Sequence, residues 1–392
     1  MNSGFGRRSM LRAAGVVGLA AAGGFVTCGS ALADGVDAPR MTVLRNESGI
    51  LAGEIFFTWV RLSGGQFAPS GVEIADAAGT PLWATSSASF AFIHFQRQFY
   101  RGRNVLTWFQ LPAGPGGGGG REQGPSWVLT ELDHTPITTI GASGEFQPDA
   151  HEQLITAANT GLVASYVEIP GDLSGVGGSV NGLIRDSYAN EVDIASGTML
   201  RRWSALDHVP LADSYAPVPS SPDQSYDYFH INSISVTPDG HLLISARNTC
   251  ALYKVHRTTG EVIWSLGGKS SSFSVAPDAV FGFQHHAAFE NPRTIRLFDN
   301  GSGDGSTNPH PSRVVWLRVD EACMTVSLAD SMSSPGDAQS IGQGSAQRLP
   351  NGNVFVSWGT NPRLSEFSPR GDLLFDAILP SPSYRAFKYP RR

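Results

Sequence analysis

The chain has 392 residues, a length that permits one large domain or two of ordinary size. Hydrophobic residues make up 41%, enough for a substantial core. Charged residues make up only 16%, below the roughly 25% typical of soluble domains, and the formal net charge is −6. This balance lacks the basic footprint of a nucleic-acid-binding protein, so nucleic acid is not expected as a partner.

The first 33 residues have the features of a secretory signal peptide. A paired Arg7-Arg8 precedes an apolar, Ala/Gly-rich run, and ALA at 31–33 forms a small-x-small cleavage site. The arginine pair favours the twin-arginine route, so we expect export to the periplasm or beyond and a mature chain that begins near Asp34. A basic unstructured tail and lipidation at Cys28 are the alternatives. No apolar stretch is long enough to predict a membrane span.

Beyond this segment, short apolar or alternating stretches recur between turn residues, and long helical periodicity is nearly absent. The clearest predicted strands each follow a dipeptide that favours a tight turn. These dipeptides are Ala78-Gly79, Ser196-Gly197, Asp239-Gly240, Thr259-Gly260 and Asn351-Gly352. Residues 34–392 are therefore predicted to form an all-β domain.

A looser unit of strands repeats along this domain. Versions of it lie at 72–84, 104–138, 151–204, 230–266, 285–318 and 345–378. A repeat of this length with about four strands is typical of a propeller blade, so we expect a single β-propeller with six blades. Five or seven blades are alternatives because the units are degenerate. A pair of β-sandwiches fits less well, since tryptophans close the units at repeat-like spacing: Trp83, Trp203, Trp264 and Trp316.

Neither the glycine run nor the cysteines predict a site. The sequence GPGGGGG at 114–120 lacks the lysine and the following helix of a phosphate-binding loop, so a surface insertion is expected. After cleavage of the signal peptide, only Cys250 and Cys323 remain. Export would allow a disulfide between them, and two separate thiols are equally compatible with the sequence.

Polar side chains interrupt several predicted strands. They are His151 in DAHEQLIT, His230, Asn232 and Arg247 in YFHINSISVTPDGHLLISARN, and Gln284, His285 and His286 in FGFQHHAAF. Residues from distant units can meet in a propeller, because the innermost strand of every blade lines the central channel. Three histidines and an arginine around one cavity suit an anion such as sulfate, phosphate or carboxylate.

Each of these residues has a structural alternative when taken alone. A single histidine on a strand usually belongs to the core, and Arg247 can lie at the surface. The stretch Asp299-Asn300-Gly301 is interpreted most simply as a turn. The joint occurrence in separate repeat units favours a shared site.

Several motifs resemble those of the arylsulfotransferase (arylsulfate sulfotransferase) family. They are HINSI, the SAR after DGHLLI, WSLGG, FGFQH, LFDNG with SR downstream, and GSAQRLPNGN, in family order from about His151 to about Leu374. The resemblance implies an exported six-bladed propeller that moves a sulfuryl group from an aryl sulfate to a phenol. It implies no nucleotide donor such as PAPS and no cofactor, and a channel histidine as nucleophile. The separate N-terminal β-domain of some members is not expected here.

The resemblance also implies roles for the residues of the predicted site. His285 matches the nucleophile, His230 and Arg247 match the oxyanion-binding pair, and His151 matches the remaining catalytic histidine.

Substrate contacts are expected from Asn232 and Gln284, and apolar walls for aromatic rings from Phe283 and Tyr228. Core packing is the alternative role for the two aromatic residues. His286 departs from the family pattern. Since successive side chains of a strand point to opposite sides, we expect His286 to face the sheet interior or a neighbouring blade.

Two other classes of function compete with sulfuryl transfer. A metal-dependent enzyme would use His285, His286 and a third histidine, but neighbours on one strand can share a metal only at a bulge or turn. The sequence also lacks HExxH-like spacing, so no metal site is predicted. A non-catalytic propeller that binds a ligand or partner is the second alternative.

Overall fold

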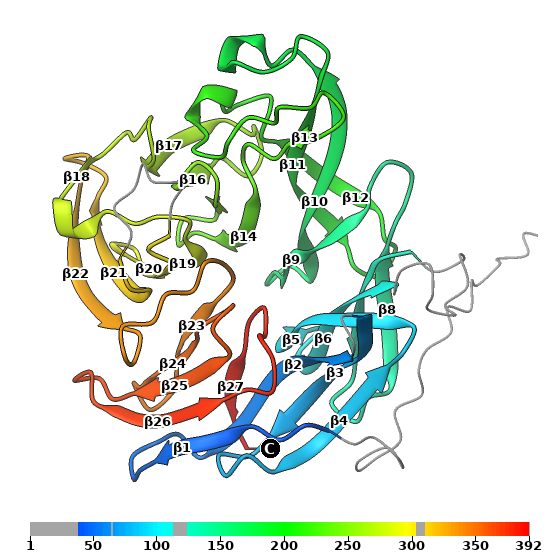
Figure 1. Cartoon of the computed structure of the whole chain (residues 1–392), viewed down its shortest axis with the longest axis vertical. Coiled ribbons are helices and arrows are strands. Elements are labelled where there is room, and N and C mark those ends of the chain that lie inside the picture. The colour runs from blue at the N-terminus through cyan, green and yellow to red at the C-terminus, as the bar shows by residue number, and fades with distance from the viewer. Residues whose placement is uncertain (1–37, 64–65, 113–123, 303–309, 392) are drawn as a thin grey trace, which may run out of the picture.

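Six β-sheets are arranged in a ring around a common centre (Figure 1). The computed structural model describes residues 38–63, 66–112, 124–302 and 310–391. In this part of the chain, helical structure is limited to three 3₁₀ turns: η1 (Ser174–Val176), η2 (Leu211–Asp213) and η3 (Pro277–Ala279). The prediction of an all-β, six-bladed β-propeller is confirmed. The predicted signal peptide, Cys28 and the glycine run at 114–120 lie outside the described residues.

Blades 2 to 5 are each built from four strands that follow one another in the chain, the first of them innermost. Blade 2 contains β5 (Phe90–Tyr100), β6 (Arg103–Pro112), β7 (Ser126–Thr130) and β8 (Pro136–Gly141). Blade 3 contains β9 (Pro148–Ile155), β10 (Thr160–Gly171), β11 (Gly182–Asp193) and β12 (Met199–Ser204), with β13 (Ser225–Tyr226) beside β11. Blade 4 contains β14 (Ile231–Val236), β15 (Leu242–Ala246), β16 (Ala251–Val255) and β17 (Val262–Gly267). Blade 5 contains β19 (His285–Asn291), β20 (Thr294–Asp299), β21 (Arg313–Asp320) and β22 (Thr325–Ser333), with β18 (Ser274–Val275) beside β22.

Strands from both ends of the described chain close the ring. Blade 1 contains β2 (Gly53–Ser63), β3 (Gln66–Ala75) and β4 (Pro81–Ser87), and its inner strand is the late β27 (Phe387–Pro390). Blade 6 contains β23 (Ser345–Arg348), β24 (Val354–Ser357), β25 (Arg363–Phe367) and β26 (Leu373–Ile378), and its outer strand is the early β1 (Thr42–Asn46). Blades 1 and 6 are also joined by a fully buried ion pair of 2.7 Å between Lys388 and Glu366.

The repeat units expected from the sequence match the last four blades better than the first two. The units at 151–204, 230–266 and 345–378 coincide closely with blades 3, 4 and 6, whereas the unit at 285–318 covers blade 5 without its fourth strand, β22. The unit at 72–84 misses β2, and the unit at 104–138 misses β5, the inner strand of blade 2. Those strands lack a simple turn-plus-alternation pattern, because β2 is a nearly continuous apolar run and β5 carries a bulge after Ile93.

Apolar side chains pack between neighbouring blades. Leu243 and Trp264 of blade 4, for example, form one cluster with Leu297 of blade 5, and all three are buried. The unit-closing tryptophans are buried too, but they are not equivalent: Trp83, Trp203 and Trp264 lie on outermost strands, whereas Trp316 lies on the third strand of blade 5.

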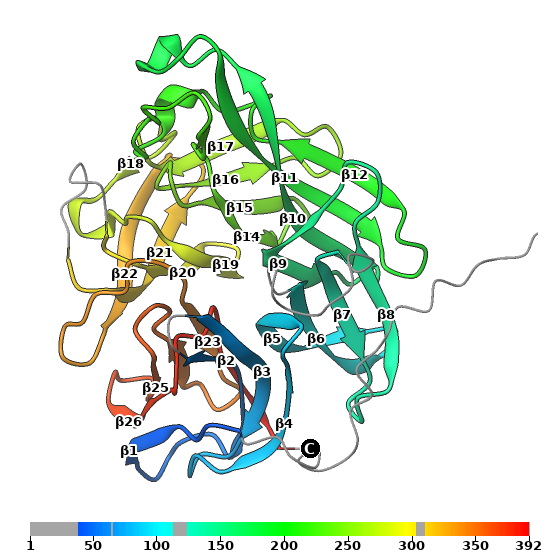
Figure 2. The ribbon, with the colours of Figure 1, turned by 45° about the vertical axis from the view of Figure 1, so that its right-hand side comes forward.

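The turn prediction is confirmed at Asn351-Gly352, which joins β23 to β24. Gly352 has a φ of 87°, a left-handed conformation that glycine adopts without steric cost. A longer hairpin distinguishes blade 3, where β10 and β11 pair from Thr160↔Asp193 to Gly171↔Gly182 and extend beyond the neighbouring strands (Figure 2).

The cysteines of the described chain do not form a disulfide with each other. Cys250 is buried beside the start of β16, and Cys323 is exposed in the turn between β21 and β22. Within the described residues, we find no helix with the length and apolar character required to cross a membrane.

Candidate active site

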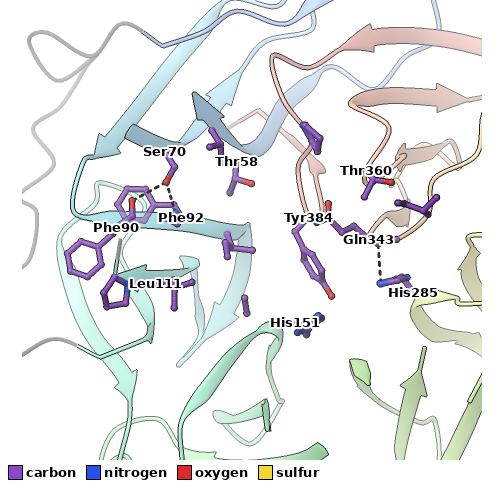
Figure 3. A pocket seen from close by; sticks show the side chains of 18 of the residues that line it. Thr58, Ser70, Phe90, Phe92, Leu111, His151, His285, Gln343, Thr360 and Tyr384 are labelled. Carbon is purple, nitrogen blue, oxygen red and sulfur yellow. Dashed lines mark hydrogen bonds between the residues drawn. The ribbon is translucent and has the colours of Figure 1, made fainter. Parts of the chain in front are cut away.

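A cavity of about 680 Å³ lies where the inner strands converge. His151, His230, Arg247 and His285 all line it. His151 belongs to β9, His230 directly precedes β14, Arg247 directly follows β15, and His285 begins β19. The structure therefore brings together the four residues that the sequence predicted to meet, from three different blades. Figure 3 shows His151 and His285 at one end of the cavity, with Tyr384 beside them.

Irregular backbone at the channel end of the inner strands places these side chains. In β14, Asn232 is an extra residue between the pairs Ile231↔Ala246 and Ser233↔Ser245, and β19 shifts register directly after His285. His230 has a φ of 58°, which few residues other than glycine adopt. Bulges break the alternation of a strand and re-aim its side chains. The positions of His230 and His285 at the cavity therefore do not follow from the side-to-side alternation of a regular strand.

The hydrogen bonds of His285 define its tautomer. Nδ1 lies 2.7 Å from the side-chain oxygen of Asn300 and 3.0 Å from the carbonyl oxygen of Phe283, and both oxygens can only accept. Nε2 accepts a hydrogen bond of 3.2 Å from the backbone N–H of Gln343, drawn as a dashed line in Figure 3. The proton of the neutral ring is therefore on Nδ1, and Nε2 carries the lone pair.

Asn300 is held in the orientation that this tautomer requires. Its amide nitrogen donates to the carbonyl oxygens of Ser340, at 2.9 Å, and Gln343, at 3.1 Å. The side-chain oxygen is thereby directed at His285. The sequence interpretation of 299–301 as a simple turn was wrong for this residue, because Asn300 is fully buried and its side chain bonds both the site histidine and the loop of blade 6.

His151 and His230 each form a pair with an aspartate. Nδ1 of His230 donates to Asp227 at 2.6 Å, and Nδ1 of His151 donates to Asp149. Each carboxylate binds the Nδ1–H of its histidine and fixes the ring so that Nε2 is left for the cavity. The sequence analysis missed both aspartates, although an acidic residue two or three positions before each histidine was a readable signal.

Aromatic rings surround the histidines. The ring centres of His151 and His230 are 4.8 Å apart, and that of Tyr384 lies 5.5 Å from His151 and 6.4 Å from His285. The Tyr384 hydroxyl donates to the carbonyl oxygen of Asn232 at 3.3 Å, which holds the ring against the channel wall. Tyr384 lies just before β27, beyond the last motif in the sequence, and no pattern there predicted it.

Arg247 supplies a positive charge to the same end of the cavity. Its guanidinium stacks over the Phe283 ring at 4.3 Å and donates to the side-chain oxygen of Asn248 at 2.8 Å. Among the described residues, no carboxylate forms an ion pair with Arg247. A guanidinium that lines a cavity with its charge unpaired is a ready partner for an anion.

The environment favours a neutral His285. Burial lowers the pKa of His285 well below the ordinary histidine value. The hydrogen bond to Asn300 acts to raise this pKa, and the positive charge of Arg247 acts to lower it further. Burial also lowers the pKa of His230, although the hydrogen bond to Asp227 opposes this. Burial acts to raise the pKa of Asp227, but the hydrogen bond and charge of His230 hold it below its usual value. The site therefore combines a neutral His285 with His–Asp pairs suited to proton exchange.

A buried charged layer supports the site from one side. The Arg385 guanidinium bonds Glu152 at 3.0 Å, Nε2 of His94 at 3.2 Å and the carbonyl oxygens of Asn232 and His151. Burial and the charge of Arg385 lower the pKa of His94 well below its usual value. One side chain from the C-terminal segment therefore connects the inner strands of blades 2, 3 and 4.

The predicted substrate contacts do not line the cavity. Asn232 is fully buried and donates to the carbonyl oxygen of Gln284 at 2.6 Å, while the Gln284 amide donates to Ser245 and to two backbone carbonyls. Tyr228 packs in the core between blades 3 and 4. Phe283 reaches the site indirectly, through its stacking with Arg247. These four residues position the site in this structure, because their side chains are used within the fold.

His286 lies against a neighbouring blade, as predicted. Its Nδ1 accepts a bond of 3.3 Å from the backbone N–H of Ala346 in β23, and its ring meets the edge of Phe387 in β27. The orientation of the His286 side chain does not come from regular strand alternation. It comes from the bulge of β19, where His286 has a φ of 50°. In the described part of the chain, no group of three or more His, Cys, Asp or Glu side chains is arranged to hold a metal ion.

The fold and the site together define a class: a six-bladed β-propeller whose central cavity is lined by three histidines and an arginine. The chain belongs to the arylsulfotransferase (ASST) family, whose model matches residues 130–379, well over half of the sequence. That family consists of sulfotransferase-type enzymes, and all four predicted catalytic residues lie within the matched range. No curated protein matches the chain.

Several solved structures are similar to this chain at low identity. A Bacteroides caccae protein of unknown function has a TM-score of 0.48 and 11% identity, covering 87% of this chain and 100% of that one. A Lactobacillus plantarum protein has a TM-score of 0.42 and 16% identity, covering 85% and 83%. The Pseudomonas aeruginosa periplasmic gluconolactonase has a TM-score of 0.43 and 14% identity, covering 86% and 99%. Likenesses of this degree say nothing about activity.

Proposed function

We propose that this protein transfers a sulfuryl group from an aryl sulfate to a phenol through a sulfohistidine at Nε2 of His285, without PAPS. One observation supports this most strongly. His285 is a neutral ring whose Nδ1–H is bound by Asn300 and whose Nε2 lone pair lies at a cavity that also holds Arg247, His230 and His151. A neutral nitrogen nucleophile beside a cation is what an anionic ester requires.

The first half-reaction forms the enzyme intermediate. Nε2 of His285 attacks sulfur, the N–S bond forms, and the S–O bond to the aryl oxygen breaks with its electron pair going to the phenolate. His230 or His151, protonated on Nε2 against its aspartate, gives its proton to that oxygen. The incoming sulfur replaces the 3.2 Å contact between Nε2 and the Gln343 N–H, and this N–H then faces a sulfuryl oxygen.

The second half-reaction is the reverse with a new phenol. The acceptor oxygen attacks sulfur, its proton passes to the histidine that acted as acid, and the N–S bond breaks with its electrons returning to Nε2. A phenol has a pKa near about 10, so a base assists this step. Arg247 binds the sulfuryl oxygens in both halves, because its charge persists while the ring nitrogen exchanges.

A chromogenic aryl sulfate tests the proposal. Purified protein is incubated with 4-nitrophenyl sulfate, with and without phenol, and both nitrophenol and phenyl sulfate are measured. We expect nitrophenol release that depends on phenol, matched by phenyl sulfate formed. Release to water that phenol does not affect would identify a sulfatase instead. A folded protein that releases nothing would favour the non-catalytic binding alternative.

We also propose that the chain is exported by the twin-arginine route. The support is the Arg7-Arg8 pair followed by an apolar run and a small-residue cleavage site.

A further inference from the structure

The cavity continues well beyond the reactive histidines. Its far part, which we call the apolar arm, is formed by blades 1 and 2 and lined by Thr58, Val60, Ser70, Ala88, Phe90, Ala91, Phe92, Ile93, Leu111 and Pro112. Figure 3 shows the two parts: Phe90, Phe92 and Leu111 lie at one end, His151 and His285 at the other, and the Tyr384 ring lies between them. The two ends belong to one continuous cavity of about 680 Å³.

The arm offers hydrocarbon and few polar partners. The Ser70 hydroxyl donates to the carbonyl oxygen of Phe90 at 3.1 Å and accepts from the N–H of Phe92 at 2.8 Å. The Thr58 hydroxyl lies 3.2 Å from that of Ser383. Both hydroxyls are therefore engaged within the protein. Among the described residues of the arm, none is charged, whereas the other end holds Arg247 and three histidines.

The two ends of the cavity also differ in their relation to the family. The four reactive residues lie inside the range 130–379 that matches the family model, and all the arm residues lie before it. The shared chemistry is therefore at one end, and the arm is built from a part of the sequence that the family model does not describe. A surface of this kind determines which substrate enters rather than which bond is broken.

We propose that the apolar arm binds the uncharged, extended apolar tail of a phenolic substrate whose oxygen lies at His285. This inference rests on the proposed function for the identity of the reacting oxygen, but binding of the tail is a separate property. A charged or sugar-like tail would not fit, because none of the described arm residues is charged and the hydroxyls of Ser70 and Thr58 are engaged within the protein. Burial of each methylene in such a site is favourable.

A series of 4-alkylphenols measures the arm without any chemistry. Binding of 4-methyl-, 4-propyl- and 4-pentylphenol to the full-length protein is measured by isothermal titration calorimetry in the absence of a sulfate donor. Since a buried CH₂ contributes about 0.8 kcal/mol, affinity is expected to rise by up to about fourfold per methylene. Affinity that stays flat along the series would overturn the proposal.

A charge placed in the arm provides the matched test. Leu111 is 43% exposed and lines the arm, so Leu111→Asp is expected to fold and to reduce the ratio of pentylphenol to methylphenol affinity by tenfold or more. Leu200 is 47% exposed on the outer strand of blade 3, outside the cavity, and Leu200→Asp should leave the ratio unchanged. Equal ratios in wild type and Leu111→Asp would overturn the assignment. Ala88→Asp, another exposed position of the arm, repeats the test.

The binding series separates this inference from the proposed function. Affinity that rises with chain length in a protein that transfers no sulfuryl group would support the arm and refute the reaction. Transfer to phenol combined with flat binding would support the reaction and refute the arm.

Discussion

Nδ1 of His285 lies 2.7 Å from the side-chain oxygen of Asn300, the shorter of its two contacts with an acceptor, and this contact helps to hold the proton of the ring on Nδ1. Asn300 cannot rotate freely, because its amide nitrogen is bound by the carbonyls of Ser340 and Gln343. The loop that leads into blade 6 therefore contributes to the tautomer of a histidine on blade 5, through Asn300 and through the Gln343 N–H at Nε2.

Removal of the Asn300 side chain is expected to impair catalysis without removing the nucleophile. Asn300→Ala removes one of the two acceptors of the Nδ1–H and leaves only the Phe283 carbonyl at 3.0 Å, so the tautomer is held less firmly and turnover should fall by up to about 10⁴-fold. Nitrogen-15 NMR of labelled histidine should show Nε2 of His285 partly protonated. Asn353→Ala is the control, because Asn353 is a buried asparagine bonded to Glu366 at 2.7 Å, away from the cavity. Similar turnover losses in both variants would contradict the positioning role.

Replacement of each neighbouring histidine is expected to have different effects. His285→Asn removes the nucleophile, so turnover should fall by several orders of magnitude and sulfur label from the donor alone should no longer attach to the protein. His286→Asn should retain labelling and cost about 1–3 kcal/mol of stability, because the buried N–H of Ala346 loses its acceptor. Labelling that survives in His285→Asn but not in His286→Asn would reverse the assignment.

The His–Asp pairs are expected to matter most for poor leaving groups. Asp227→Asn removes the carboxylate that raises the pKa of His230, so less imidazolium is available to protonate a leaving phenolate. Turnover of phenyl sulfate should therefore fall more than that of 4-nitrophenyl sulfate, whose leaving group needs less assistance. Asp149→Asn tests His151 in the same way, and the exposed Asp172→Asn is the control. Equal losses for both substrates in both pair variants would exclude a proton-transfer role.

Glu73 is expected to make the stability fall as pH rises. It is fully buried in β3, neither carboxyl oxygen has a hydrogen-bond partner among the described residues, and burial raises its pKa to about 8. Between the unfolded pKa of about 4.5 and the folded value, the folded state holds a proton that the unfolded state has lost. Stability should therefore decrease by up to about 1.4 kcal/mol per pH unit across this window and level off above it.

Urea denaturation at pH 5.5, 6.5 and 7.5 measures this effect. Glu73→Gln cannot ionise, so its stability relative to wild type should increase steadily with pH. Glu145→Gln is the control, because the Glu145 side chain is 88% exposed. A difference between Glu73→Gln and wild type that is independent of pH would show that Glu73 has an ordinary pKa.

The export proposal concerns residues outside the described structure. Replacement of Arg7 and Arg8 by lysine should leave the uncleaved precursor in the cytoplasm, because the twin-arginine route reads the arginine pair. Cell fractionation and N-terminal sequencing are the measurements, and the wild-type mature chain should begin near Asp34. Normal export of the lysine variant would indicate the general secretory route.

The sequence predicted the ring and four side chains that line its central cavity, because both leave local signals. Turn dipeptides and apolar stretches outline blades 3 to 6, and motifs identify His151, His230, Arg247 and His285. The inner strands β5 and β27 were not recognised, because one carries a bulge and the other is paired with a strand more than three hundred residues earlier.

The partners of the site residues were harder to predict. Asn300 resembles any asparagine in a turn until its contact with His285, fifteen residues away, is seen. Tyr384 is placed by ring closure, which no local pattern describes. Asn232 and Gln284 were assigned to the substrate, yet both bond within the fold, because a polar residue in a motif can serve the backbone as well as the ligand.

The late inner strand of blade 1 has a consequence for the order in which the protein is made. Tyr384, which lines the cavity, and Arg385, which bonds three blades, both lie just before β27 near the C-terminal end. A ribosome adds these residues after the five other inner strands have been synthesised. The ring and the reactive centre are therefore completed by the same few residues. A nascent chain that stops before Tyr384 has the histidines but neither a closed channel nor the guanidinium beneath them, so synthesis itself delays the appearance of a complete site.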